Sequence, residues 1–541
     1  MPTVIIDGQE LEIAAGERLN GIQAAARLGI QIPHYCWHPG LSVVASCRMC
    51  LVESGRQDAD SGEISMIPKL VPACQTPVAD GSVFVTNSDK VINARAMVEE
   101  DLLIRHPIDC PICDKAGECH LQDYHFQHGR EARRADLKPF TSRRRNLGDT
   151  VTLFVDRCVM CSRCVRFCRE ISGTSELMVT DRGAHEEIDV FPGFPLENKL
   201  SGNVVDLCPV GALGDRDFLY SQRVWFMQGN RQVCAGCSTG CSIDVEQNQD
   251  RIYRIKPREN PHVNQWWMCD EGRYGWKHVH DPARVSGPRR REDNQMVNVE
   301  WSQLSGELDQ VLRTAGHLAA VLSPHLTVEE AYLLASYIRE LDSHALLAVG
   351  PIPQQDEDES FAGGFTIRAE KCPNRRGVEQ IVSRVGGQLV SWDDFLQRLP
   401  VDNPAAVWVT GGYKTVWNDA ATADVFSAVD TLIVQDLFAS PLFDRADYQL
   451  PAAAFAERAG SYVNYADRLQ SFDWSIRPPA GVVVEGQLVW RLLGRAGLYQ
   501  PTDVLADIAR EFVFFSAAAA GVPEHGVDLK LNQLAGVQSG S

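Results

Sequence analysis

The chain has 541 residues, of which 44% are hydrophobic and 23% are charged, so it can build several packed domains. Its formal net charge of -19 at pH 7 argues against a nucleic-acid partner, because phosphate binding needs a basic surface. No apolar run approaches the roughly 20 residues of a membrane helix, and the N-terminus lacks a signal-peptide pattern. We therefore expect a cytoplasmic protein that reaches a membrane only through partners.

Residues 1–80 are predicted to form a small β-rich domain with one helix. Two short apolar segments, 4–7 and 11–13, flank Gly8 as the strands of a hairpin do. In residues 17–28 the apolar side chains recur on one helical face, which predicts a helix packed against the hairpin.

Cysteine is the most informative residue type. Of the 17 cysteines, 16 precede residue 270 and form four close groups, and only Cys372 lies beyond it. A secreted disulfide protein would spread an even number of cysteines through a small chain. The grouping therefore predicts metal sites.

The first group comprises Cys36, Cys47, Cys50 and Cys74. Four thiolates are what a two-iron cluster needs. The close Cys47/Cys50 pair can hold one iron, while Cys36 and Cys74 reach the other. A structural zinc site is the alternative.

The second group lies in residues 81–128, which are predicted to be helical around it, and comprises His106, Cys110, Cys113 and Cys119. Three cysteines leave one corner of a four-iron cube without a ligand. A neutral imidazole there would remove one negative charge and raise the reduction potential. The spacing alone leaves open whether His106 is a ligand or only packs nearby, and the set also suits zinc.

The third group comprises Cys158, Cys161, Cys164, Cys168 and Cys208. The first four follow the bacterial ferredoxin spacing C-x2-C-x2-C-x3-C, in which three cysteines bind one cluster and the fourth serves another. No second run of this kind exists here. Cys208, which precedes a proline, is therefore expected to complete the four-iron site, and Cys168 is predicted to be a buried free thiol.

Three arginines, Arg163, Arg166 and Arg169, alternate with the ligands of the third group. Their charge can raise cluster potentials, or they can lie on the surface of a helix. The sequence leaves both interpretations open.

The fourth group comprises Cys234, Cys237, Cys241 and Cys269. Its C-x2-C-x3-C spacing with one distant cysteine predicts a four-iron cluster, with zinc as the alternative.

Beyond this group, apolar runs alternate with helical stretches such as 327–341 and 487–493. This alternation predicts a parallel sheet with helices on its faces. The runs expected to be strands are 318–322, 345–349, 405–409 and 431–434.

The order and spacing of the four groups resemble the large iron–sulfur subunit of NADH:quinone oxidoreductase (respiratory complex I), which is called the G subunit in bacteria. The resemblance implies that His106 is a ligand and that the chain holds one 2Fe-2S and three 4Fe-4S clusters. It also implies that three clusters relay electrons from a flavin toward quinone. Our hypothesis is that electrons pass through the two-iron, His106 and Cys158 sites, in that order. The fourth cluster is expected to be structural.

The same resemblance implies the partners and the place of the chain. The expected partners are the flavin-bearing NADH-oxidising subunit and other subunits of the peripheral arm. The expected location is peripheral, on the cytoplasmic side of the inner membrane.

The C-terminal region resembles the molybdopterin oxidoreductase fold. In formate dehydrogenases a metal-binding cysteine or selenocysteine precedes a T-x-E-E-x-Y run, and here Leu326 occupies that position in SPHLTVEEAYLL. Leucine cannot ligate molybdenum, so no molybdopterin is expected. The chain is also shorter than is usual for the family, so parts of this fold are expected to be missing.

We therefore predict an α/β multidomain protein with a β-grasp N-terminal domain. The expected domains are a 2Fe-2S ferredoxin-like domain (1–80), a helical 4Fe-4S domain with one His and three Cys ligands (81–146), a 4Fe-4S ferredoxin-like domain (147–218), a 4Fe-4S domain of molybdopterin-oxidoreductase type (219–275) and a degenerate molybdopterin-oxidoreductase-like α/β region (276–541).

Several other functions compete with this interpretation. Leu326 disfavours a formate dehydrogenase, and the long C-terminal region disfavours the cluster subunit of an NAD-linked hydrogenase. An iron-only hydrogenase needs several further cysteines for its catalytic cluster, and only Cys372 follows the fourth group, which excludes that function. If the four groups instead bound zinc, the chain would be a structural scaffold. The chain lacks G-x-G-x-x-G and G-x-x-x-x-G-K-[ST] motifs, so NADH and flavin are expected on a partner. No catalytic residue is expected; the enzyme would be the complex.

Overall fold

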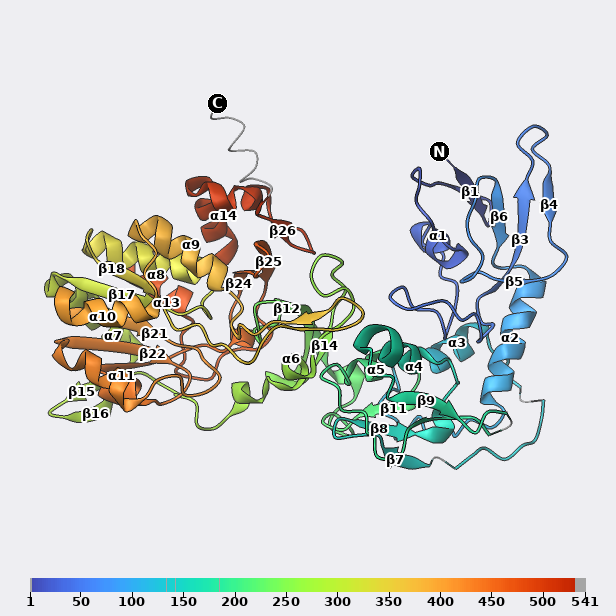
Figure 1. The fold of residues 1–541 in the computed structure, drawn as a ribbon, viewed down its shortest axis with the longest axis horizontal. Helices are drawn as coiled ribbons and strands as arrows, with labels where there is room; N and C mark the ends of the chain where they lie inside the picture. The colour runs from blue at the N-terminus through green and yellow to red at the C-terminus, as the bar shows by residue number, and fades with distance from the viewer. Residues whose placement is uncertain (1, 133, 142, 184, 531–541) are drawn as a thin grey trace. The chain divides into compact units, whose positions relative to one another are not determined.

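The computed structural model describes residues 2–132, 134–141, 143–183 and 185–530 (Figure 1). The chain forms two compact units. The first comprises Met1–Met227 with Phe361–Phe365, and the second comprises Gln228–Ser360 with Thr366–Ser541. Among the described helices, none is long and apolar enough to cross a membrane. The finer division into five domains stays a prediction.

The first unit begins with a six-stranded sheet of order β2-β1-β6-β3-β4, in which β5 also pairs with β3. The strands β1 and β2 form the predicted antiparallel hairpin, and β1 runs parallel to β6. The strands are β1 (Thr3–Ile6), β2 (Gln9–Glu12), β3 (Leu51–Gln57), β4 (Ile64–Met66), β5 (Val71–Pro72) and β6 (Ser82–Val85).

One helix, α1 (Gly21–Arg27), contributes Ile22 to the core of this sheet. It begins four residues later than predicted, because Asn20 is its N-cap and forms a capping box with Gln23. Cys50 and Cys74 belong to the same core cluster, so the first ligand group is anchored in packed structure.

The next segment contains two helices, α2 (Asp89–Leu103) and α3 (His120–His128). The second ligand group lies between them in turns and irregular chain, so residues 81–128 are helical only in part. Cys119 is the N-cap residue of α3.

The third ligand group lies among short elements. The sheet β11-β8-β7 and the hairpin of β9 and β10 accompany two five-residue helices and a π-helical turn. These elements are β7 (Arg144–Asn146), β8 (Val151–Phe154), α4 (Arg163–Phe167), η2 (Cys168–Ser172), β9 (Leu177–Thr180), β10 (Glu187–Val190), α5 (Asn203–Leu207) and β11 (Leu213–Asp215).

The second unit begins with a three-stranded antiparallel sheet that carries the fourth ligand group. Cys234 follows β12 (Gln228–Val233), and Cys241 precedes β13 (Ser242–Asn248). The third strand is β14 (Arg251–Pro257), and Cys269 caps the helix α6 (Asp270–Tyr274).

A seven-stranded sheet of order β16-β15-β23-β22-β21-β17-β18 forms the body of this unit (Figure 1). Neighbours from β23 to β18 are parallel, which confirms the predicted parallel sheet, whereas β15 and β16 form an antiparallel edge. The strands are β15 (Arg289–Glu292), β16 (Gln295–Asn298), β17 (Leu318–Leu322), β18 (Leu346–Val349), β21 (Ala406–Thr410), β22 (Thr431–Asp436) and β23 (Tyr448–Pro451).

Helices cover both faces of this sheet. Successive residues of a strand point to opposite sides, so each strand contributes to two cores. In β17, Leu318, Ala320 and Leu322 enter one core, and Ala319 and Val321 enter the other. The helices are α7 (Trp301–Ala315), α8 (Val328–Leu341), α9 (Arg375–Gly386), α10 (Trp392–Asp402), α11 (Ala420–Val425), α12 (Pro441–Arg445), α13 (Glu485–Leu492) and α14 (Pro501–Glu511). A small sheet of β24 (Gly460–Val463), β25 (Arg468–Phe472) and β26 (Val527–Asp528) and a hairpin of β19 (Glu359–Ser360) and β20 (Thr366–Ile367) complete the unit.

Candidate iron–sulfur sites

The first group of cysteines is gathered by the pairing of β3 with β5. Cys50 precedes β3 and Cys74 follows β5, and Ala73 donates its backbone N–H to the Cys50 carbonyl at 3.0 Å. The Cys36 backbone N–H donates to Cys47 Sγ at 3.5 Å, and the Cys36 thiol contacts those of Cys47 and Cys74. The four predicted ligands therefore lie together, and Cys36, Cys50 and Cys74 are buried.

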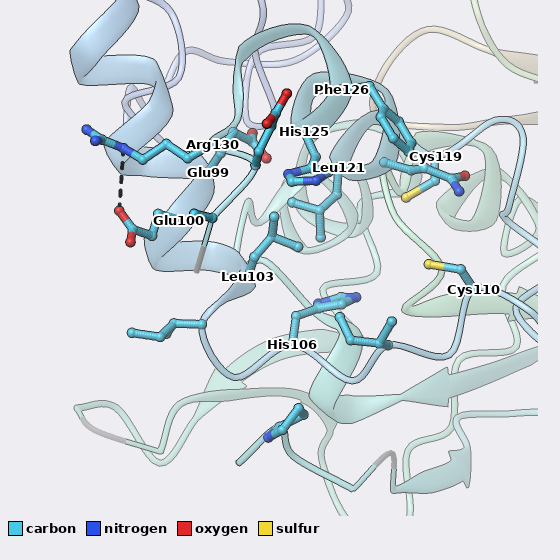
Figure 2. Close-up of a pocket in the computed structure, with 16 residues that line it drawn as sticks. Glu99, Glu100, Leu103, His106, Cys110, Cys119, Leu121, His125, Phe126 and Arg130 are labelled. Carbon is cyan, nitrogen blue, oxygen red and sulfur yellow. Dashed lines mark ion pairs between the residues drawn. The ribbon is translucent and has the colours of Figure 1, made fainter. Parts of the chain in front are cut away.

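Three of the second group's four residues line one cavity of about 400 Å³ between α2 and α3. Figure 2 shows the sulfur atoms of Cys110 and Cys119 facing one another, with the His106 ring in the same cavity. Burial and the nearby Arg157 guanidinium lower the pKa of His106 to about 4, so its imidazole is neutral at pH 7. The neutral ring is the form that ligates metal.

Cys113 does not line that cavity but lies against Gly211, in the segment that follows Cys208. A Cβ at Gly211 would come within 2.2 Å of Cys113 Sγ, so only glycine fits here. The requirement for Gly211 was not predicted, because the sequence does not show which cysteine approaches it.

The third group surrounds a cavity of its own, lined by Cys158, Cys161, Cys164 and Cys208. The fifth cysteine, Cys168, is not part of that lining and is fully buried at the junction of α4 and η2. Burial raises the pKa of Cys161 to about 11, so the thiol is neutral until a metal displaces its proton.

The fourth group is held by backbone contacts. Cys234 donates its backbone N–H to the Cys241 carbonyl at 2.8 Å, and Gly236 and Gly272 donate to the sulfurs of Cys234 and Cys269, each at 3.4 Å. Such N–H···S contacts are a means by which proteins tune cluster potentials. The four sulfurs are buried.

Lys414, which the sequence analysis did not single out, lines a cavity together with Cys234 and Gly236. Its Nζ atom lies 3.8 Å from the position that a Cβ of Gly236 would occupy. No sequence signal marks this lysine, because it comes from the loop after β21.

Two arginines join the first site to the third. Arg166 donates to the carbonyl oxygen of Cys36 and, at 3.3 Å, to that of Cys161. Arg163 donates to the carbonyls that adjoin Cys36 and Cys208 in sequence, those of Trp37 at 2.6 Å and Leu207 at 3.2 Å. Both arginines are buried.

Arg169 differs from the other two arginines. Its side chain is 62% exposed and pairs with Glu170. The sequence left open whether the three arginines face the ligands or the solvent. In the structure Arg163 and Arg166 contact the ligand segments, whereas Arg169 faces the solvent.

The third site also contacts the second. His120, which follows Cys119, donates its backbone N–H to the carbonyl of Pro209, which follows Cys208, at 2.9 Å. Arg157, which precedes Cys158, donates to Asp109, which precedes Cys110, at 2.9 Å. The contact between the first and second sites is less direct: the His34 N–H donates to the hydroxyl of Tyr124 at 3.3 Å.

No three His, Cys, Asp or Glu side chains of the described residues converge on a point where one metal ion could bind. A cluster distributes its ligands over several irons, so its thiolates need not converge in this way. The buried cysteines around shared cavities offer the donor set that such clusters use.

The run that includes Leu326 has a structural role in the second unit. Leu326 is 2% exposed and belongs to the main hydrophobic core. Thr327 and Glu330 form the capping box of α8, and Glu330 pairs with Arg458 at 2.7 Å. Glu329 accepts the backbone N–H of Ser461 at 2.8 Å.

Five family models match the chain in succession. They are described as a 2Fe-2S iron-sulfur cluster binding domain (residues 2–89), an NADH-ubiquinone oxidoreductase-G iron-sulfur binding region (95–134), a ferredoxin-like domain of NADH-quinone oxidoreductase subunit 3 (148–214), a molybdopterin oxidoreductase Fe4S4 domain (227–281) and molybdopterin oxidoreductase (391–481). The predicted order of ferredoxin-like, 4Fe-4S and molybdopterin oxidoreductase domains is thereby confirmed.

Curated proteins match the chain over about two thirds of its length. The G subunit of NADH-quinone oxidoreductase from Rickettsia typhi is 34% identical over 349 residues, which cover 64% of this chain and 49% of that protein. The 75 kDa subunit of NADH-ubiquinone oxidoreductase from Reclinomonas americana is 33% identical, covering 66% and 51%. The G subunit of the Escherichia coli NADH-quinone oxidoreductase is 32% identical, covering 65% and 38%.

The predicted resemblance to the large iron–sulfur subunit of complex I is therefore confirmed. The chain spans about half the length of the first curated relatives that it matches.

Proposed function

We propose that this chain is an iron–sulfur electron-transfer subunit of an NADH:quinone oxidoreductase. Within the first unit, three ligand groups contact one another through the ligand residues themselves or their sequence neighbours. The observation that carries the proposal is Arg166, which donates to the carbonyls of Cys36 and Cys161 and so joins two candidate sites through one side chain. Electron transfer needs redox centres held close together and shielded from water.

The proposed ligands are those predicted from the sequence, with one 2Fe-2S cluster at the first site and one 4Fe-4S cluster at each of the others. Clusters bound there would supply reversible one-electron transfer. The cavity lined by Cys158, Cys161, Cys164 and Cys208 supports Cys208 as the fourth ligand of the third site. The neutral imidazole of His106 beside Cys110 and Cys119 supports its role at the second.

The contacts favour a different order of sites from the one expected. We expected the second site between the first and the third. Arg163 and Arg166 connect the first site directly to the third, and the His120–Pro209 hydrogen bond connects the third to the second. We propose that electrons pass in the order first, third, second.

The partners follow from the relatives, which are subunits of an NADH-oxidising complex. We propose that a flavin-bearing subunit delivers electrons to this chain and that other peripheral-arm subunits receive them. The chain would lie peripherally on the cytoplasmic side of the inner membrane. Leu326, buried in an apolar core, supports the expectation that no molybdopterin is bound, in contrast to a formate dehydrogenase.

Electron paramagnetic resonance of the assembled complex tests this function. After NADH is added without oxygen, we expect reduced-cluster signals from the first three sites. Signals that appear with dithionite but never with NADH would contradict the proposed relay.

His106→Cys tests the ligand assignment of the second site. A thiolate in place of the neutral imidazole adds a negative charge, so the cluster should persist with a lower reduction potential. A redox titration of the second-site signal measures this. An unchanged potential would show that His106 is not a ligand, and Cys372→Ala, remote in sequence, serves as the control.

A further inference from the structure

A buried carboxyl group faces the cavity at the second site, and the proposed relay does not use it. Glu99, on α2, is 0% exposed and lines the cavity together with His106 and Cys119 (Figure 2). Its Oε1 accepts the hydroxyl hydrogen of Tyr35, the residue before Cys36. Its Oε2 has no hydrogen-bond partner among the residues that the structure describes. Glu99 thus lies between the first and second sites.

Within the described part of the chain, no cation forms an ion pair with Glu99. Arg95, one turn earlier on α2, points its Nη2 at the Leu51 carbonyl, 3.5 Å away. Arg130 and Arg134 pair instead with the neighbouring Glu100. A buried carboxylate without a cation favours its protonated form.

Other titratable and charged groups surround Glu99 on every element packed against it. They are Tyr35 in the first-site loop, Arg95 and Glu100 on α2, His106 and Cys110 after it, Cys119, Tyr124, His125 and His128 on α3, and Arg130 and Glu131 beyond α3. Burial raises the pKa of Glu99 to about 7, against the opposing effect of the Tyr35 hydrogen bond. The carboxyl group can therefore change its protonation state near neutral pH.

We propose that Glu99 is a proton-binding site coupled to electron uptake at the second site. This inference rests on the proposed function, because it needs a cluster held by His106, Cys110, Cys113 and Cys119. When one electron arrives from the reduced flavin of the partner, the added negative charge raises the proton affinity of Glu99. One proton from water in the cavity then binds the unpartnered Oε2, and reoxidation releases it.

Linkage fixes the sign of the expected effect. Since reduction favours protonation, protonation favours reduction by the same free energy. The potential of the second site should therefore be highest at low pH, where Glu99 is already protonated. The potential should fall as pH rises from the Glu99 pKa of the oxidised state to the higher Glu99 pKa of the reduced state, because only the reduced state holds the proton in that range.

The test is a redox titration of the second-site signal in the whole complex at several values between about pH 6 and pH 9. In the unaltered protein we expect the potential to fall with pH. In Glu99→Gln we expect one potential at every pH, equal to the low-pH value of the unaltered protein, because the neutral amide imitates the protonated carboxyl. A Glu99→Gln protein whose potential still falls with pH would overturn the proposal.

Two further variants separate proton binding from a structural role. Tyr35→Phe removes a hydrogen bond that favours the carboxylate, so the fall in potential should move to higher pH. Glu100→Gln changes the neighbouring carboxylate, which is already paired with Arg130 and Arg134, and should leave the pH dependence unchanged. Loss of the pH dependence in Glu100→Gln would overturn the assignment to Glu99. A complex without any second-site signal would refute the proposed function itself, which is a distinct result.

Discussion

Replacing Cys208 with alanine should remove about four of roughly 14 iron atoms, because three thiolates do not complete a four-iron site. The described lining of the third-site cavity contains four thiols, those of Cys158, Cys161, Cys164 and Cys208, so no further thiol there replaces the lost ligand. In the assembled complex, NADH should still reduce the first site but no longer the second, because electrons pass through the third site in the order that we propose. Iron analysis and electron paramagnetic resonance measure both effects.

Cys168→Ala is the matched control for this variant. Cys168 is as buried as the ligands and only four residues beyond Cys164, but it does not line the cavity. The control should keep all of its iron and its NADH-reducible signals. If Cys168→Ala loses the cluster and Cys208→Ala keeps it, the ligand assignment is wrong.

Arg458→Met should destabilise the second unit by about 3–5 kcal/mol, because it leaves two buried carboxylates without their cation. Arg458 pairs with Glu330 at 2.7 Å and with Glu485 at 2.9 Å, and all three side chains are at most 6% exposed. Hydrogen exchange of the amides in β24 reports the free energy of opening, since this strand begins two residues after Arg458.

The loss in Arg458→Met should depend on pH. Burial raises the pKa of Glu485 to about 7 even with Arg458 present, and removal of the cation raises it further. A carboxyl whose folded pKa exceeds its unfolded value loses stability as pH rises through the folded value. The stability of the variant should therefore be closest to that of the unaltered protein at about pH 5 and furthest from it at about pH 8.

Arg477→Met is the control for charge alone. The Arg477 side chain is 77% exposed in its pair with Asp250, and such pairs contribute only about 0–1 kcal/mol. Equal losses in the two variants, or a loss in Arg458→Met that does not change with pH, would contradict the role of the buried triad.

The parallel sheet could be predicted from the sequence because its strands are buried on both faces. Such strands form continuous apolar runs, and 318–322 matches β17 to the residue. The start of α1 was predicted less well, because apolar periodicity continues through residues that lie before the Asn20 cap. Periodicity shows which face is buried, whereas side-chain capping decides where a helix begins.

Ligand grouping could also be predicted, because cluster chemistry imposes short spacings within each group. The relation between groups could not, since it depends on contacts between segments far apart in the chain. Arg166 meets Cys36 across 130 positions, and Gly211 meets Cys113 only after both segments fold. Glu99 gives no signal in the sequence, because a glutamate in a helix is ordinarily a solvated residue.

Metal analysis of protein purified without oxygen is the most direct test of the central claim that this chain carries electrons. Four filled sites predict about 14 iron atoms per chain and no molybdenum. Zinc in place of iron would make the chain a structural scaffold. Stoichiometric molybdenum would show that the C-terminal region performs its own chemistry, which contradicts the account.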